Sequence, residues 1–127
     1  MKRLLPLTVL LASCASTPQL PTYFEGLGNG ALEFRYTDVT AGLVLCYPPK
    51  PTNAFSQMRF ISAAGPGWAT FEYRRWLSKE PTVEIWIDND ATGEGTEVRV
   101  RTTDVNMGQP IYHSLVAWLN HGFNGVC

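Results

Sequence analysis

The sequence predicts a small α+β domain, in which an antiparallel meander of four to five strands carries one C-terminal amphipathic helix on one face. Several short segments alternate apolar and polar residues, which is typical of strands with one face toward water. One segment near the C-terminus instead repeats its apolar residues at helical spacing. The chain has 127 residues, of which 45% are hydrophobic and 17% charged, as in an ordinary globular protein. We therefore expect a single domain over residues 23–127.

The strands are predicted from period-two alternation between turn-forming residues. In the clearest example, Val83, Ile85 and Ile87 share one face, whereas Glu84 and Trp86 lie on the other. The predicted strands cover residues 31–37, 57–62, 68–77, 82–88 and 96–102. The segment before them, residues 23–30, is rich in glycine and is predicted to form turns.

The apolar run at residues 42–47 fits either of two structures. It is short enough for a buried strand, and the prolines of residues 48–51 end it. Asp38 and Thr40 are also suitable caps for a short helix at this point. The sequence leaves the choice open.

The predicted C-terminal helix begins near Pro110 and stops near Gly122. Proline suits the first turn of a helix, because its missing N–H would have no intrahelical partner there. Ile111, Leu115 and Trp118 recur at helical spacing, and Leu119 extends the same stripe. This stripe is expected to pack across the apolar face of the sheet.

The first residues of the chain are typical of a secretory signal, with two basic residues followed by an apolar run at 4–11 that is too short to span a bilayer. The run leads into Leu11-Ala12-Ser13-Cys14, which resembles the lipobox of bacterial lipoproteins. This resemblance implies that Leu11, Ala12 and Ser13 are read by the signal peptidase, that residues 1–13 are removed and that Cys14 is lipidated. The alternative is a soluble secreted protein with an incidental cysteine beside the cleavage site.

The resemblance also implies a location. Ala15 follows Cys14, where an aspartate would resemble the retention signal of the inner membrane in enterobacterial lipoproteins. We therefore expect an outer-membrane protein, anchored by acyl chains and facing the periplasm. Residues 14–22 contain two prolines and are predicted to be an extended tether.

Two cysteines remain once Cys14 is assigned to the lipid. Cys46 and Cys127 are expected to form a disulfide, because the periplasm is oxidising and the domain is small. The alternative is a pair of free thiols, one buried and one on a flexible end.

The candidate catalytic and metal-binding patterns are weak. The loop at residues 88–94 begins like a calcium loop, but its twelfth position is Arg99, so a hairpin turn is the preferred interpretation. His113 and His121 are eight residues apart on one helix, which is too far to share a metal ion. The glycines at positions 26, 28 and 30 lack the flanking strand and helix that a phosphate-binding loop requires. We assign no catalytic residue, metal ligand or cofactor-binding residue, and expect a protein that is not an enzyme.

The charge of the chain does not indicate nucleic acid as a partner. Ten Lys and Arg residues balance eleven Asp and Glu residues to a net charge of −1, without a basic stripe. Glu72, Glu84 and Asp88 are expected on the outer sheet face among arginines, as on an ordinary solvated surface.

Three tryptophans form the candidate binding face. In the predicted register Trp68, Trp76 and Trp86 lie opposite the apolar face, where exposed aromatic rings are typical of surfaces that bind proteins or sugars. The alternative is that a bulge or the loop at residues 48–56 buries them.

Two functions are compatible with these features. One is a non-catalytic envelope component that binds an envelope protein or a cell-wall component. The other is an inhibitor or immunity protein against a lytic or toxic enzyme, acting through the hairpin at residues 88–95 or the loop at 48–53. Hydrolysis of wall material is a weaker third hypothesis.

Overall fold

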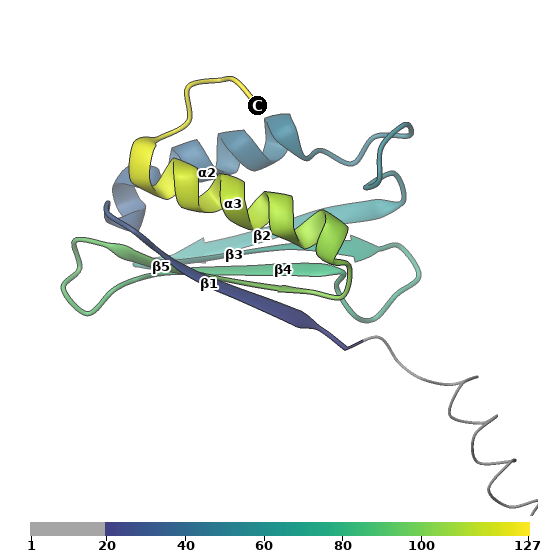
Figure 1. The fold of residues 1–127 in the computed structure, drawn as a ribbon, viewed down its shortest axis with the longest axis horizontal. Coiled ribbons are helices and arrows are strands. Elements are labelled where there is room, and N and C mark those ends of the chain that lie inside the picture. Colours follow the sequence, from purple (N-terminus) through teal and green to yellow (C-terminus); the bar gives the residue numbers. More distant parts are fainter. Residues whose placement is uncertain (1–19) are drawn as a thin grey trace, which may run out of the picture.

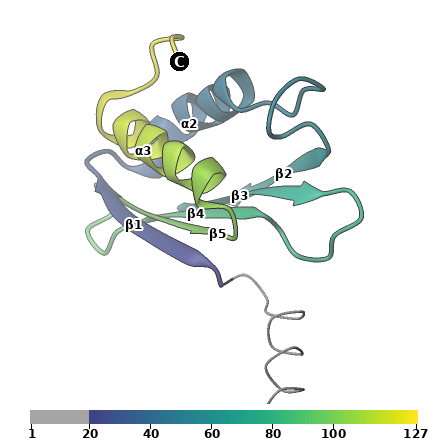
Figure 2. The same ribbon diagram turned by 45° about the vertical axis from the view of Figure 1, so that its right-hand side comes forward.

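The computed structural model describes residues 20–127, which form one five-stranded antiparallel sheet with two helices on one face (Figures 1 and 2). The α+β class and the C-terminal helix packed on the sheet are confirmed. Leu11, Ala12, Ser13 and Cys14 lie outside the described residues. The elements in chain order are β1 (Thr22–Gly28), α2 (Leu32–Cys46), β2 (Met58–Gly65), β3 (Trp68–Arg75), β4 (Val83–Asn89), β5 (Thr96–Thr102) and α3 (Val105–His121).

The spatial order of the strands is β1-β5-β4-β3-β2. Strands β2 to β5 form the predicted meander, in which each strand pairs with the next along the chain. Strand β1 lies on the far side of β5 and pairs with it antiparallel, from Thr22 opposite Thr102 to Gly28 opposite Thr96. The first strand is thus joined to the last.

The core lies between the sheet and the helices. Helix α3 covers β1 and β5, whereas α2 lies beside α3 and contacts β4. The inward side chains of the central strands are almost completely shielded from solvent, as expected for the apolar face of a covered sheet. They include Phe71, Tyr73, Val83, Ile85, Ile87, Val98 and Val100.

Helix α2 corrects one expectation and resolves a choice that the sequence left open. Residues 31–37, predicted to be a strand, form its start, and the ambiguous residues 42–47 belong to its last turns. Leu32, Val39 and Leu43 recur at helical spacing and are buried in the core. The alternation at 31–37 misled because Phe34, one of its apolar members, is in fact 75% exposed on the outer side of the helix.

Strand β1 corrects a second expectation, because residues 23–30 were predicted to form turns. Gly26 and Gly28 are needed for close packing rather than for a turn. A Cβ at Gly26 would lie 2.6 Å from the Tyr112 hydroxyl, and one at Gly28 would lie 2.6 Å from Leu119 Cβ. The two glycines let α3 lie directly on β1.

Helix α3 begins at Val105, five residues before the predicted start at Pro110. The Asp104 side chain caps it by accepting a hydrogen bond of 3.1 Å from the Asn106 N–H. Pro110 therefore lies inside the second turn rather than at the first position. The end of the helix at His121, followed by Gly122 with a positive φ of 79°, agrees with the predicted stop.

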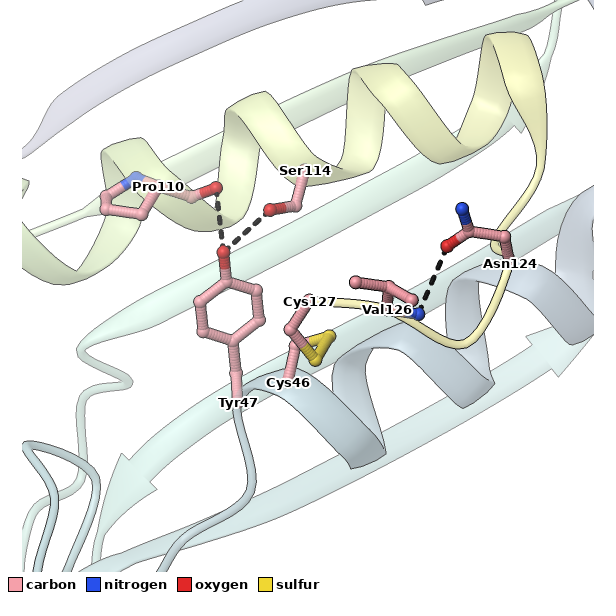
Figure 3. Close-up of a disulfide and its surroundings, with 7 residues drawn as sticks. All are labelled: Cys46, Tyr47, Pro110, Ser114, Asn124, Val126 and Cys127. Atoms are coloured by element: carbon pink, nitrogen blue, oxygen red, sulfur yellow. Dashed lines mark hydrogen bonds between the residues drawn. A yellow bond between two sulfur atoms is a disulfide. The ribbon is translucent and has the colours of Figure 1, made fainter.

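The expected disulfide joins Cys46, the last residue of α2, to Cys127 (Figure 3). The two Cα atoms are 5.5 Å apart, in the usual range for a disulfide. The segment after α3 is thereby held against the end of α2.

Candidate binding face

The sheet face that points away from both helices carries the sequence-predicted tryptophans, and we call it the open face. Along β3, β4 and β5 its side chains alternate with the buried ones. The open face comprises Tyr23, Glu25 and Leu27 from β1, Arg59, Ile61 and Ala63 from β2, Trp68, Thr70, Glu72 and Arg74 from β3, Glu84, Trp86 and Asp88 from β4, Glu97, Arg99 and Arg101 from β5, and Trp76 just after β3.

The three tryptophans differ in exposure. Trp68 and Trp76 are 40% and 64% exposed, whereas Trp86 in the middle of the sheet is half-buried. Two of the rings carry an arginine: the Arg99 guanidinium carbon is 4.9 Å from the Trp86 ring centroid, and that of Arg59 is 5.2 Å from Trp76. Such cation–π pairs hold both the ring and the guanidinium plane in place at the surface.

A shallow groove of about 410 Å³ crosses the open face between β1 and β4. Trp86, Arg99 and Leu27 form part of its lining. Three carboxylates, those of Glu25, Asp88 and Glu97, also border it. The groove therefore combines an aromatic ring, an alkyl chain, a guanidinium and carboxylates, which together can contact a polar ligand with apolar faces.

Beside this groove, opposite charges are paired, once between β4 and β5 and once within β3. Glu84 lies opposite Glu72 in the β3–β4 register, and this juxtaposition of like charges is relieved by arginines on both sides. Arg101 bonds to Glu84 at 3.2 Å, and Arg74 contacts Glu72 at 3.1 Å. Burial raises the pKa of Glu84 above its usual range, although Arg101 acts in the opposite direction. The alternation of charge expected for the outer face is thus a network of pairs.

The loop between β4 and β5 is fixed by one carboxylate. Oδ1 of Asp90 accepts hydrogen bonds from the Thr92 N–H at 3.0 Å, the Thr92 hydroxyl at 2.6 Å and the Gly93 N–H at 3.1 Å. These bonds, led by the one from the Thr92 hydroxyl, lower the pKa of Asp90. The segment is the hairpin turn preferred on sequence grounds, with residues 91–94 exposed at its tip.

A second hollow, of about 540 Å³, lies beside the disulfide and was not predicted from sequence. The Tyr47 hydroxyl donates to the Pro110 carbonyl at 3.1 Å, so Ser114, 2.6 Å away, is the donor in the bond between the two hydroxyls (Figure 3). Ser114 therefore contacts a phenol rather than a base. His113, although next to Ser114 in the chain, is exposed and packs its ring against Tyr112.

The remaining sequence patterns concern the glycines near β1 and possible metal-binding or membrane-spanning segments. Gly26 and Gly28 lie within β1, and α2 begins two residues after Gly30, so a strand and a helix do adjoin these glycines, contrary to expectation. However, the Leu32 N–H at the start of α2 donates to Asn89 Oδ1 at 2.8 Å, so this N–H is already used and does not point to a phosphate-binding loop. Within residues 20–127, no three His, Cys, Asp or Glu side chains are grouped as a metal site would require. The described helices are also too short or too polar to cross a membrane.

No protein-family model matches this chain, and a search of curated proteins finds no significant match.

Proposed function

We propose that the protein is a lipid-anchored lipoprotein of the outer membrane that faces the periplasm and binds an envelope protein or cell-wall component through the open face, without catalysing a reaction. The observation that carries the binding role is the sheet face that neither helix of residues 20–127 covers, with Trp68, Trp76 and Trp86 across it. The lipobox-like Leu11-Ala12-Ser13-Cys14 supports the anchor. The disulfide is consistent with an oxidising compartment.

The binding role is tested by capture from solubilised envelope. The Trp86→Ala and Trp68→Ala variants should retain less of the partner than the unchanged chain does, because truncated aromatic anchors weaken an interface. Phe34→Ala is the matched control, since Phe34 is 75% exposed on the helix-covered side of the molecule. Equal loss of the partner in all three variants would contradict a role for the open face.

The anchor is tested at Cys14. Replacing Cys14 with Ser should abolish acyl labelling and leave the precursor uncleaved, because the thiol is the site of acylation in the lipoproteins that this segment resembles. Metabolic labelling with a fatty acid checks this outcome. A Cys14→Ser protein that still carries the labelled chain would rule out the proposed anchor.

The second candidate, an inhibitor or immunity protein, is favoured by the β4–β5 loop. Asp90 fixes this exposed loop before any partner binds, and a preorganised loop reduces the entropy cost of inserting into a cleft. In this case the captured partner would be a single hydrolase. Glu94→Arg at the loop tip would release it, whereas Trp86→Ala would not.

A further inference from the structure

Strand β2 forms an unprotected edge of the sheet. It runs for eight residues and pairs one to one with β3 from Met58 to Gly65, without a bulge. It carries no charge or proline from Phe60 to Gly65. On the helix side Ser62 and Ala64 are exposed. Exposed edges are normally blocked by charges, prolines, bulges or short length, and β2 has none of these from Phe60 onward.

The opposite edge, β1, is protected in a way that β2 is not. The Tyr112 hydroxyl donates to the Glu25 carbonyl at 2.6 Å, and the Asn120 amide donates to the Leu27 carbonyl at 3.1 Å. Side chains of α3 therefore hydrogen-bond to backbone carbonyl groups of β1. In the described part of the chain, no side chain hydrogen-bonds to the backbone of residues 59–65.

The register shows which backbone groups of β2 are unpaired. The Trp76 N–H donates to the Gln57 carbonyl at 3.2 Å, so the odd-numbered residues of β2 direct their backbone groups toward β3. Phe60, Ser62 and Ala64 accordingly direct their N–H and C=O groups outward. These groups can form backbone hydrogen bonds with one further antiparallel strand.

The order of side-chain sizes along β2 favours β2 of a second copy as the further strand. The strand reads Met-Arg-Phe-Ile in its first half and Ser-Ala-Ala-Gly in its second, so large residues precede small ones. If β2 pairs antiparallel with itself about Ser62, Phe60 of each copy lies opposite Ala64 of the other, and Ile61 lies opposite Ala63. The same register places Arg59 opposite Gly65, away from the other arginine. Large side chains meet small ones throughout, and no like charges are opposed.

We infer that β2 is a dimerisation edge, at which two copies of this chain pair their β2 strands about a two-fold axis through Ser62 to form one continuous sheet. An axis perpendicular to the sheet keeps the helices of both copies on the same side and both open faces on the other. It pairs even-numbered residues with even-numbered ones, as the outward backbone groups require. The dimer would present two open faces side by side.

Sedimentation of the full chain in detergent, with charges placed on the axis, tests this inference. The unchanged chain should sediment as a dimer. Ser62→Lys and Ser62→Glu should each weaken self-association by about tenfold or more, because each variant brings two like charges together on the axis. An equimolar mixture of the two variants should restore a dimer that contains one copy of each. Leu27→Lys, on the β1 strand, is the control and should leave the dimer intact.

Circular dichroism should show the same fold for all variants, since the Ser62 side chain is exposed. A chain that sediments as a monomer at every concentration would overturn the inference, even if β2 captures an extended segment of another protein. A dimer that resists Ser62→Lys, or a mixture that associates no better than either variant alone, would also overturn it.

Discussion

At the scale of single residues, Tyr73 places an unpaired polar group in the core. Its side chain is fully buried. The centroid of its ring lies 4.9 Å from the ring centroid of Phe55 and 5.0 Å from that of Phe60. The hydroxyl has no hydrogen-bond partner among the described residues, and burial raises its pKa. An unpaired buried hydroxyl costs stability, because it loses its bonds to water on folding.

We therefore expect Tyr73→Phe to stabilise the domain by about 1 kcal/mol, since it removes the hydroxyl and keeps the packing of the ring. Urea unfolding at neutral pH measures the change. A loss of similar size would instead mean that the hydroxyl is hydrogen-bonded to a buried water.

The Glu84–Arg101 ion pair predicts that the stability cost of replacing Arg101 depends on pH. Burial raises the pKa of Glu84 in the folded state, so its charged form opposes folding above that pKa and the opposition disappears as the pH falls through it. Arg101 offsets this effect only while Glu84 is charged. Arg101→Ala should thus cost about 1 kcal/mol at pH 7 and clearly less at pH 4.

Urea unfolding of Arg101→Ala at the two pH values gives this difference. In a Glu84→Gln background the same substitution should lose most of its pH dependence. If the cost of Arg101→Ala is equal at both pH values, the pair does not affect stability.

At the scale of elements, the alternation of apolar and polar residues predicted the strands that are buried regularly on one side. Strands β3, β4 and β5 alternate buried and exposed residues throughout, so residues 68–77, 82–88 and 96–102 were placed closely and Trp68 and Trp86 were oriented correctly. The same alternation oriented the charged residues of the open face. It did not predict which of them pair: Arg101 meets Glu84 through the register of β4 and β5, whereas Arg74 pairs with Glu72 of its own strand.

Helix α2 and strand β1 were harder to predict than the other elements partly because each contains a glycine that packs against α3. Gly42 of α2 lies against Trp118, where a Cβ would be 2.7 Å from the ring, and Gly26 lies against Tyr112. Glycine has low intrinsic preference for either a helix or a strand, so local sequence argues against both elements. Tertiary packing overrides that preference, and the contact with α3 cannot be recognised from either segment alone.

Neighbouring residues of β4 should respond oppositely to truncation. Ile85 is completely buried in the core, so Ile85→Ala should cost roughly 2–5 kcal/mol by opening a cavity. Trp86 points to the open face, and Trp86→Ala should cost only about 1 kcal/mol, largely from lost contact with Arg99. Thermal melts of the two variants compare them directly. If Trp86→Ala melts as early as Ile85→Ala, Trp86 is a core residue and the open face is not a binding surface.

At the scale of the whole molecule, the disulfide joins residues 81 positions apart. Closing a loop of this length is worth about 4.5 kcal/mol in the chain-entropy description. Cys46→Ser and Cys127→Ser should each lower the free energy of unfolding by a few kcal/mol, and the double variant should cost little more than either single one. Thiol titration before and after reduction, together with urea unfolding, checks both statements. Additive losses would show that the two sulfurs are not bonded to each other.

The position of β1 also sets the order in which the sheet is completed. Each strand from β3 to β5 follows its partner closely in the chain, whereas β1 pairs with β5, which is separated from it by the rest of the meander. Contacts between such distant segments form slowly, because a long loop must close first. During synthesis β1 is therefore made before its partner, and it cannot pair until β5 has also been made. Its two glycines lower its tendency to pair with other strands, so the residues that admit α3 in the folded state also keep β1 available until β5 arrives.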